Sequence, residues 1–224
     1  MASKNPDPGA IKLVVFDIDG TLVDAYPAIA DSVNHMLGCL GYPPRSLAAV
    51  KRSVGWGVDG LVRKFVPEAE AAMALDIFRR HHDARLRRNI RVLPGVKPLL
   101  RFLKRRGCVL AVASNRPAKF CKIILGTLGI DGYFTHVIGG DAVRRAKPYP
   151  DMLTRILKES GARASQAIFV GDMTVDIACG RAAGIFTLAV PTGSCTRAEL
   201  KAARPDALIR RISEVRGFLA LKKT

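Results

Sequence analysis

Residues 11–24 read IKLVVFDIDGTLVD, an apolar run followed by a pair of carboxylates. The β-branched and apolar residues of the run predict a buried strand of a parallel sheet. Asp17 and Asp19 leave this strand at its carboxyl end, and the Gly-Thr pair after them turns the chain away. Ligands of open α/β sheets bind at that edge. Because paired carboxylates repel each other unless a cation lies between them, the stretch predicts a chemical site.

Each of these residues taken alone also has an ordinary structural interpretation. An Asp-Gly pair such as Asp19-Gly20 is common in turns, and Asp17 could cap a helix. Two carboxylates that flank Ile18 and precede Gly-Thr-Leu fit those explanations less well. We therefore interpret the stretch as functional, provided that the rest of the chain supplies the matching structural context.

Length and composition indicate one core domain with room for a small inserted one. The chain has 224 residues, 49% of them hydrophobic, and no apolar run reaches membrane-spanning length, so we expect no membrane partner. Residues 1–10 are polar and contain no signal-peptide core, which predicts a soluble cytoplasmic protein. The five cysteines are widely spaced and form no Cys-x-x-Cys pair, which predicts reduced structural thiols. The oligomeric state is not predicted.

The net charge of +17 is concentrated in one stretch. Residues 79–106 contain eleven Lys and Arg and a single acid, Asp83. We interpret most of these side chains as the solvated faces of helices, and next as a positive field that attracts small anionic substrates. The stretch has few aromatic residues and no known nucleic-acid motif, so nucleic acid is disfavoured as a partner. A nucleic-acid-binding protein remains the alternative of another class, and a salt-dependent gel shift that survives Asp17→Asn would identify it.

The order of predicted elements indicates an α/β fold. Apolar residues at helical spacing predict helices over residues 27–40, 46–54, 58–65 and 68–88, with Gly55-Trp56-Gly57 separating the second from the third. Beyond them, strands at 109–113, 135–138, 167–170, 186–190 and 207–209 alternate with helices at 96–106, 119–128, 151–160 and 175–183. We therefore expect a parallel-sheet core formed by residues 1–24 and 93–224, with a helical domain of residues 25–92 inserted after the first strand.

Polar residues follow the predicted strands at what should be one edge of the sheet, because parallel strands end on the same side. Besides the first pair of acids, they are Ser114, Asn115, Arg116, Lys147, Asp172 and Asp176.

This set suits phosphoryl chemistry. An aspartate can attack phosphorus and form an acyl phosphate, provided that the negative charge of its target is neutralised. Magnesium serves that purpose, with Asp17 and Asp172 as direct ligands and Asp176 behind them, orienting a water or a lysine.

The remaining members of the set would bind the phosphoryl group and move protons. Lys147 and the hydroxyl and amides around Ser114 would hold the phosphoryl oxygens. Asp19 would protonate the leaving oxygen and then deprotonate the water that cleaves the acyl phosphate.

Four segments, FDIDGTLVD, VASN, AKPYPD and GDMTVDI, resemble in content and order the motifs of the haloacid dehalogenase superfamily over about residues 13–219. The resemblance implies a Rossmann-like three-layer core, an inserted helical cap of the C1 type and a magnesium cofactor. It implies Asp17 as the nucleophile, Asp19 as the acid/base, and the backbone carbonyl of Asp19 as a further metal ligand. It also implies Ser114 and Lys147 as phosphate ligands and Asp172 as a metal ligand.

The segment SVGWGVDGLVRKF, together with LPGV, SNRP, VIGGD and GDMTVDIACGRAAG, is similar to phosphoglycolate phosphatases. This similarity implies a phosphomonoesterase acting on 2-phosphoglycolate or another small anionic phosphate ester, and a loop near Gly55 that reaches the core when the cap closes. Met173, Tyr149 and residues 192–195 depart from the subfamily pattern and leave the substrate open. The candidate substrate contacts are Thr21, Arg52, Gly55, Trp56, Gly57, Asn115 and Arg116.

The same residues disfavour most other activities within and outside the superfamily. A dehalogenase does not need the acid/base that Asp19 supplies, and no lysine of the cap is a convincing Schiff-base residue for a phosphonatase. A phosphorylated signalling receiver carries its acceptor on a later strand and has no cap. A hexose phosphate mutase would use the same aspartates but return the phosphoryl group to sugar, so it stays as the alternative enzyme.

Overall fold

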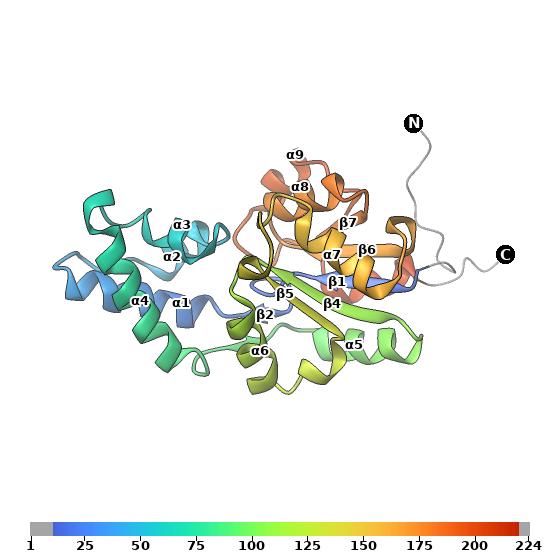
Figure 1. Ribbon diagram of the computed structural model, residues 1–224, viewed down its shortest axis with the longest axis horizontal. Coiled ribbons are helices and arrows are strands. Elements are labelled where there is room, and N and C mark those ends of the chain that lie inside the picture. The colour runs from blue at the N-terminus through green and yellow to red at the C-terminus, as the bar shows by residue number, and fades with distance from the viewer. Residues whose placement is uncertain (1–10, 220–224) are drawn as a thin grey trace.

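The computed structural model describes residues 11–219. The polar segment of residues 1–10, for which we predict no signal-peptide core, lies outside that range. Figure 1 shows two parts: a body built around a sheet, and a group of helices to one side of it. No described helix is both long enough and apolar enough to cross a membrane.

Within the described residues the body contains a six-stranded sheet in the order β5-β4-β1-β6-β7-β8, with every neighbouring pair parallel. Its strands are β1 (Leu13–Phe16), β4 (Val109–Ser114), β5 (His136–Gly139), β6 (Ala167–Gly171), β7 (Phe186–Ala189) and β8 (Ala207–Leu208). β1 lies between β4 and β6, with Val15 opposite Ala111 and Phe169. The chain order therefore reverses at β1, and such a switch point is where open α/β sheets bind ligands.

Alternate side chains of β1 pack against the helices on the two faces of the sheet. Val14 and Phe16 face the apolar cluster formed with α5 (Val96–Arg105) and α6 (Ala118–Thr127). Leu13 and Val15 face the opposite cluster, formed with α7 (Asp151–Ser160) and Cys179 of α8 (Thr174–Ala182). Because successive side chains of a strand point to opposite faces, a fully apolar strand has to be covered on both sides. The predicted three-layer α/β core is confirmed.

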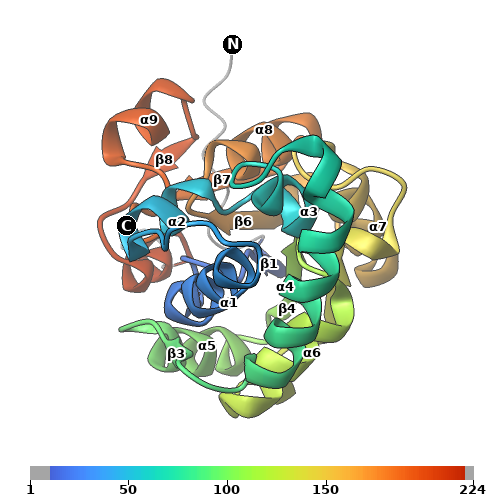
Figure 2. The same cartoon turned by 90° about the vertical axis from the view of Figure 1, so that its left-hand side faces the viewer.

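The helices of the insertion share an apolar cluster of their own. They are α1 (Tyr26–Cys39), α2 (Leu47–Ser53), α3 (Gly57–Val62), the 3₁₀ helix Glu68–Glu70 and α4 (Ala71–Arg85). Val33, Leu37, Leu75 and Phe78 are among the residues buried between them. Figure 2 shows this group facing the viewer, in front of the sheet body. The separate cluster supports the proposed division of the chain into residues 25–92 and the rest.

Two short strands lie at the ends of the insertion, where the chain leaves the sheet body and where it returns. β2 (Val23–Asp24) pairs antiparallel with β3 (Arg91–Val92), and the Arg91 guanidinium lies 2.8 Å from Asp24. β2 and β3 are defined by their pairing with each other across the insertion, so the sequence does not predict them. The helix α9 (Arg197–Ala202) and the four 3₁₀ helices of the described sheet body are also absent from the predicted elements. The latter are Asp131–Tyr133, Gly140–Ala142, Ala164–Gln166 and Ile212–Phe218.

The basic stretch of residues 79–106 lies on the surface, as predicted. Every lysine and arginine in it is exposed. The buried positions of α4 and α5 are apolar, apart from His82. The five cysteines all have free thiols, in agreement with the predicted reduced state.

Candidate active site

The pair of acids lies where β1 ends and the chain turns sharply. The backbone N–H of Asp17 still donates to Val170 at 2.9 Å, so its side chain is fixed at the edge of the sheet. Gly20 then adopts a φ of 87°, and a Cβ atom there would lie 2.6 Å from the Asp172 carboxylate. A side chain is therefore excluded from the turn that brings the first loop against the loop after β6.

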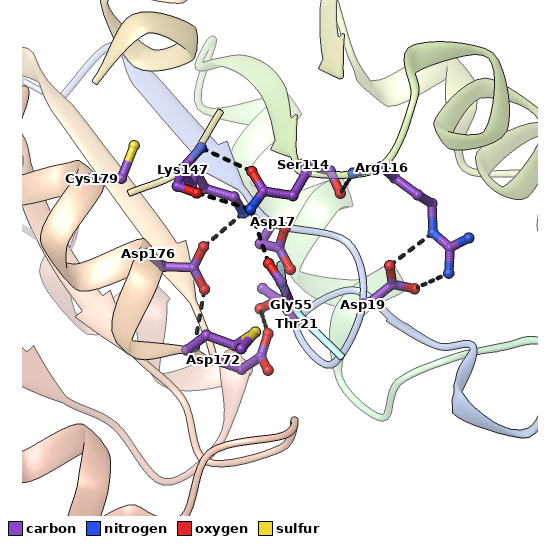
Figure 3. Close-up of polar contacts among 12 residues, drawn as sticks. Asp17, Asp19, Thr21, Gly55, Ser114, Arg116, Lys147, Asp172, Asp176 and Cys179 are labelled. Carbon is purple, nitrogen blue, oxygen red and sulfur yellow. Dashed lines mark hydrogen bonds and ion pairs between the residues drawn. The ribbon is translucent and has the colours of Figure 1, made fainter. Parts of the chain in front are cut away.

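Lys147 is the cation at the centre of the site. Its Nζ atom lies 2.6 Å from Asp17 and 2.7 Å from Asp176, and its side chain is only 3% exposed (Figure 3). Asn115 fixes the backbone of this lysine, because its amide accepts from the Lys147 N–H at 2.9 Å and donates to the Lys147 carbonyl at 3.0 Å. The same amide donates to the Gly55 carbonyl at 2.9 Å. We predicted that Asn115 contacts substrate; in the structure its amide binds the backbone of two loops, at Gly55 and at Lys147.

Three carboxylates meet beside this lysine. One oxygen each from Asp17, Asp172 and Asp176 lies within 4.8 Å of the others, and all three residues are buried. Asp172 accepts from the Thr21 hydroxyl at 2.8 Å and from the Ser194 N–H at 3.2 Å. Thr21, predicted as a substrate contact, thus holds a carboxylate in place.

The charges of this cluster do not balance without a further cation. Burial raises the pKa of Asp17 to about 7, although Lys147 opposes the shift. Burial and the nearby Asp17 likewise raise the pKa of Asp172. Burial lowers the pKa of Lys147, but Asp17 and Asp176 outweigh it and the net shift is upward. Three buried carboxylates beside one ammonium form a hard oxygen donor set that fits a divalent cation such as Mg²⁺.

These shifts predict a pH-dependent stability of the metal-free protein. Because Asp17 binds its proton more tightly in the folded state, the free energy of unfolding should fall as pH rises from its ordinary pKa of 3.8 to about 7. Mg²⁺ should remove this fall, since it binds the ionised carboxylates. Urea unfolding at several pH values, with chelator or with Mg²⁺, measures the effect. Asp17→Asn should show a smaller chelator-dependent fall, because only the raised pKa of Asp172 then contributes. A fall as large as that of the wild type would contradict the raised pKa of Asp17.

The remaining polar residues of the site are Ser114, Asp19 and Arg116. Ser114 is 3% exposed, and its Oγ atom accepts from the Arg116 N–H at 3.3 Å. The Arg116 guanidinium donates to both oxygens of Asp19, at 2.8 and 3.0 Å. In this structure Arg116 therefore binds Asp19, although we predicted a contact to substrate.

A cavity of about 50 Å³ connects these groups with the inserted helices. Asp17, Asp19, Ser114 and Lys147 line its polar side, and apolar side chains from α1, α3 and α4 line the other. The predicted contacts Gly55 and Gly57 also line it, as do Asn115 and Arg116.

Two other predicted substrate contacts lie apart from the cavity. Trp56 is 55% exposed and does not line it. The guanidinium of Arg52, on α2, lies 2.8 Å from the Glu199 carboxylate and donates to the Ser194 carbonyl at 3.0 Å. Arg52 therefore links the helical group to the loop before α9.

Tyr26 is a site residue that the sequence reasoning missed. Its hydroxyl lies 3.3 Å from the Asp19 carbonyl and 3.5 Å from Asp172, next to the acidic cluster. Tyr26 begins α1, so in the sequence it reads as one more apolar residue of that helix. Only its place directly after the first motif could have pointed to the site.

Gly193 provides a test of the acidic cluster. A Cβ atom at this position would overlap the Asp172 carboxylate. We expect Gly193→Ala to displace Asp172 and to weaken Mg²⁺ binding by about 10-fold or more, as measured by calorimetry. Gly126→Ala is the matched control, because a Cβ atom there meets nothing within 4 Å. Equal Mg²⁺ affinity in both variants would exclude Asp172 from the cation site.

Comparison with known proteins shows which family the chain is similar to. A family model described as haloacid dehalogenase-like hydrolase matches residues 14–190. A phosphoglycolate phosphatase of Pseudomonas fluorescens is 37% identical over 188 residues, which are 80% of this chain and 69% of that protein. A plasmid-encoded phosphoglycolate phosphatase of Cupriavidus necator is 34% identical over 212 residues, 92% of each chain. The crystal structure of a "predicted phosphoglycolate phosphatase" from Haemophilus somnus superimposes with a TM-score of 0.88 at 28% identity, covering 94% of this chain and 99% of that one.

Together with the fold and the acidic site, these similarities identify an enzyme of the hydrolase class. The chain belongs to the haloacid dehalogenase-like hydrolase family, as its motifs predict, and it resembles phosphoglycolate phosphatases.

Proposed function

We propose that this protein is a magnesium-dependent phosphomonoester hydrolase that works through a phosphorylated aspartate. The observation that carries the proposal is the buried Asp17 carboxylate, which lines the cavity and lies 2.6 Å from Lys147. A nucleophile in such a site must stay ionised, and the lysine together with a divalent cation would keep it so.

In the first step, an oxygen of Asp17 attacks the substrate phosphorus. The bond from phosphorus to the ester oxygen breaks, and that oxygen takes a proton from Asp19 and leaves as an alcohol. The phosphoryl group is then held on Asp17 as an acyl phosphate. The Lys147 ammonium and the Ser114 hydroxyl bind its oxygens, which stabilises the charge of the transition state.

In the second step, a water molecule attacks the phosphorus of the acyl phosphate. Asp19, which lost its proton in the first step, takes one from this water. The bond from phosphorus to Asp17 breaks, so that inorganic phosphate leaves and the Asp17 carboxylate is restored.

The cation would be held by Asp17, Asp172 and the backbone carbonyl of Asp19. When bound, it neutralises the phosphoryl charge that would otherwise repel the Asp17 carboxylate. Asp176 does not need to bind it directly, because its carboxylate already accepts from Lys147 and from the Met173 N–H at 3.0 Å. Asp176 would therefore fix the lysine.

For the substrate we propose 2-phosphoglycolate or a similarly small phosphate ester. The names of the relatives support this choice. The cytoplasmic location remains a prediction from the sequence.

A panel of phosphate esters tests the proposal. We expect phosphate release from 2-phosphoglycolate with Mg²⁺, and its loss with chelator or in Asp17→Asn. Activity on other esters alone would support the phosphatase activity but exclude 2-phosphoglycolate as its substrate. Phosphoryl transfer between hexose positions without phosphate release would instead identify a mutase.

A further inference from the structure

His82 is a buried polar residue whose role the proposed mechanism leaves open. It lies on α4 at 1% exposure, within a stretch whose lysines and arginines are all exposed, and its ring stacks on Phe78 with centroids 5.1 Å apart. Its Nε2 atom lies 2.9 Å from Nη1 of Arg116, and its Nδ1 atom lies 3.0 Å from the Ser32 hydroxyl. The ring thus connects α1 and α4 of the inserted group with the loop after β4.

The hydrogen bonds of the ring define where its proton lies. A guanidinium group can only donate, so Nε2 of His82 must accept from Arg116. The Ser32 hydroxyl donates its own proton to the Ala28 carbonyl at 3.0 Å and therefore accepts from Nδ1. Burial, reinforced by Arg116, lowers the pKa of His82 to about 3. The neutral ring with its proton on Nδ1 is accordingly the form that meets Arg116.

The Arg116 guanidinium is held between two partners, Asp19 and His82. Its Nε and Nη2 atoms donate to the two oxygens of Asp19, while Nη1 donates to His82 (Figure 3 shows the Asp19 side). All three nitrogens have a partner, and the side chains of Arg116 and Asp19 are only 6% and 12% exposed. The direction of the guanidinium plane, and with it the position of the Asp19 carboxylate, therefore depends on His82.

We propose that His82 is a positioning residue that fixes Arg116 and, through it, the proton-transferring carboxylate of Asp19. The inference rests on the proposed phosphomonoesterase, in which Asp19 moves the protons. Because His82 and Ser32 belong to the inserted helices and Arg116 and Asp19 to the sheet body, the contact forms only when the two parts lie together. Asp19 is thus aligned at the moment when the cavity around the ester is closed.

The variant His82→Leu tests this role, since it keeps the apolar bulk against Phe78 but removes the acceptor. In single turnovers we expect acyl-phosphate formation from 2-phosphoglycolate to slow by about 10²-fold, the usual consequence of a misplaced catalytic group. Acetyl phosphate is of similar size, but its acetate leaves without a proton from Asp19. Its transfer rate to Asp17 should therefore change little. A loss of general structural integrity would slow both substrates alike.

Five further variants separate positioning from packing. His82→Gln retains an acceptor near the Nε2 position and should restore most of the rate. His81→Leu is the matched control: His81 also lies 3.2 Å from the Ser32 hydroxyl but makes no hydrogen bond to Arg116, so both rates should stay at the wild-type value. His82→Leu combined with Arg116→Leu should be no slower than Arg116→Leu alone, because the histidine acts through the arginine. If His82→Leu does not fold, Ser32→Ala, which frees Nδ1, should slow the 2-phosphoglycolate reaction selectively.

Three results would overturn the inference while leaving the phosphatase intact. They are equal slowing of both substrates, additive losses in the double variant, and a higher KM for 2-phosphoglycolate at unchanged single-turnover rate. The last of these would mean that Arg116 binds the substrate carboxylate. A wild-type protein that transfers phosphate from neither substrate would contradict the proposed function itself.

Discussion

Replacing Asp17 by Asn is expected to lower phosphate release by on the order of 10⁴-fold or more, the scale on which loss of a catalytic nucleophile acts. The amide cannot form the acyl phosphate, so neither step of the proposed reaction remains. The fold should persist, because the substitution keeps the size of the side chain and removes one of three mutually repelling buried carboxylates. Steady-state phosphate release measures the loss, and circular dichroism and thermal melting confirm the fold.

Asp131→Asn is the matched control for this substitution. Asp131 is an exposed aspartate in a 3₁₀ helix away from the cavity, so its variant should retain wild-type turnover. Turnover by Asp17→Asn within a few-fold of the control would contradict the assignment of the nucleophile.

The second large effect is expected for Lys147→Met. This substitution leaves the carboxylates of Asp17 and Asp176 without the ammonium that lies 2.6 and 2.7 Å from them. Removing one partner of a buried ion pair destabilises by about 3–5 kcal/mol, and we expect a loss of that order in metal-free protein at neutral pH. Mg²⁺ should recover part of the stability, since it compensates the same carboxylates, but turnover should stay low because a phosphate ligand is missing. Denaturant unfolding with and without Mg²⁺ measures both.

The exposed Lys119 supplies the control, because Lys119→Met removes a charge without touching the site. Combining Lys147→Met with Asp176→Asn should restore part of the lost stability, since one uncompensated carboxylate is removed. Unchanged stability of Lys147→Met in the absence of metal would show that the lysine does not balance the acidic cluster.

The parts of the fold that the sequence predicts are those with a long apolar pattern. β1 and β6 are buried on both faces and read as continuous apolar runs, and Gly55 and Gly57 break α2 from α3 through positive φ angles. β2 and β3 have two residues each and are defined by their pairing with one another, which no local pattern records.

The acids and Lys147 could be predicted because strand order alone brings them together. The neighbours that hold them could not, since their contacts join distant parts of the chain. Arg116 meets Asp19 across 97 positions and His82 across 34, and the motif around Arg116 shows neither partner. His82 in particular stands in the basic stretch, where the arginines around it are exposed and only tertiary packing shows that it is buried.

The central claim, that Asp17 becomes phosphorylated, is tested most directly by trapping the acyl phosphate. The enzyme is mixed with a labelled phosphate ester and Mg²⁺, quenched in acid within one turnover, and reduced with borohydride, which converts a phosphorylated aspartate to homoserine. We predict that the label appears on the protein at least as fast as the enzyme turns over, and that homoserine is found at position 17 by mass spectrometry. Phosphate release with no modification at Asp17, or with the label on another residue, would contradict the assignment of Asp17 as the nucleophile.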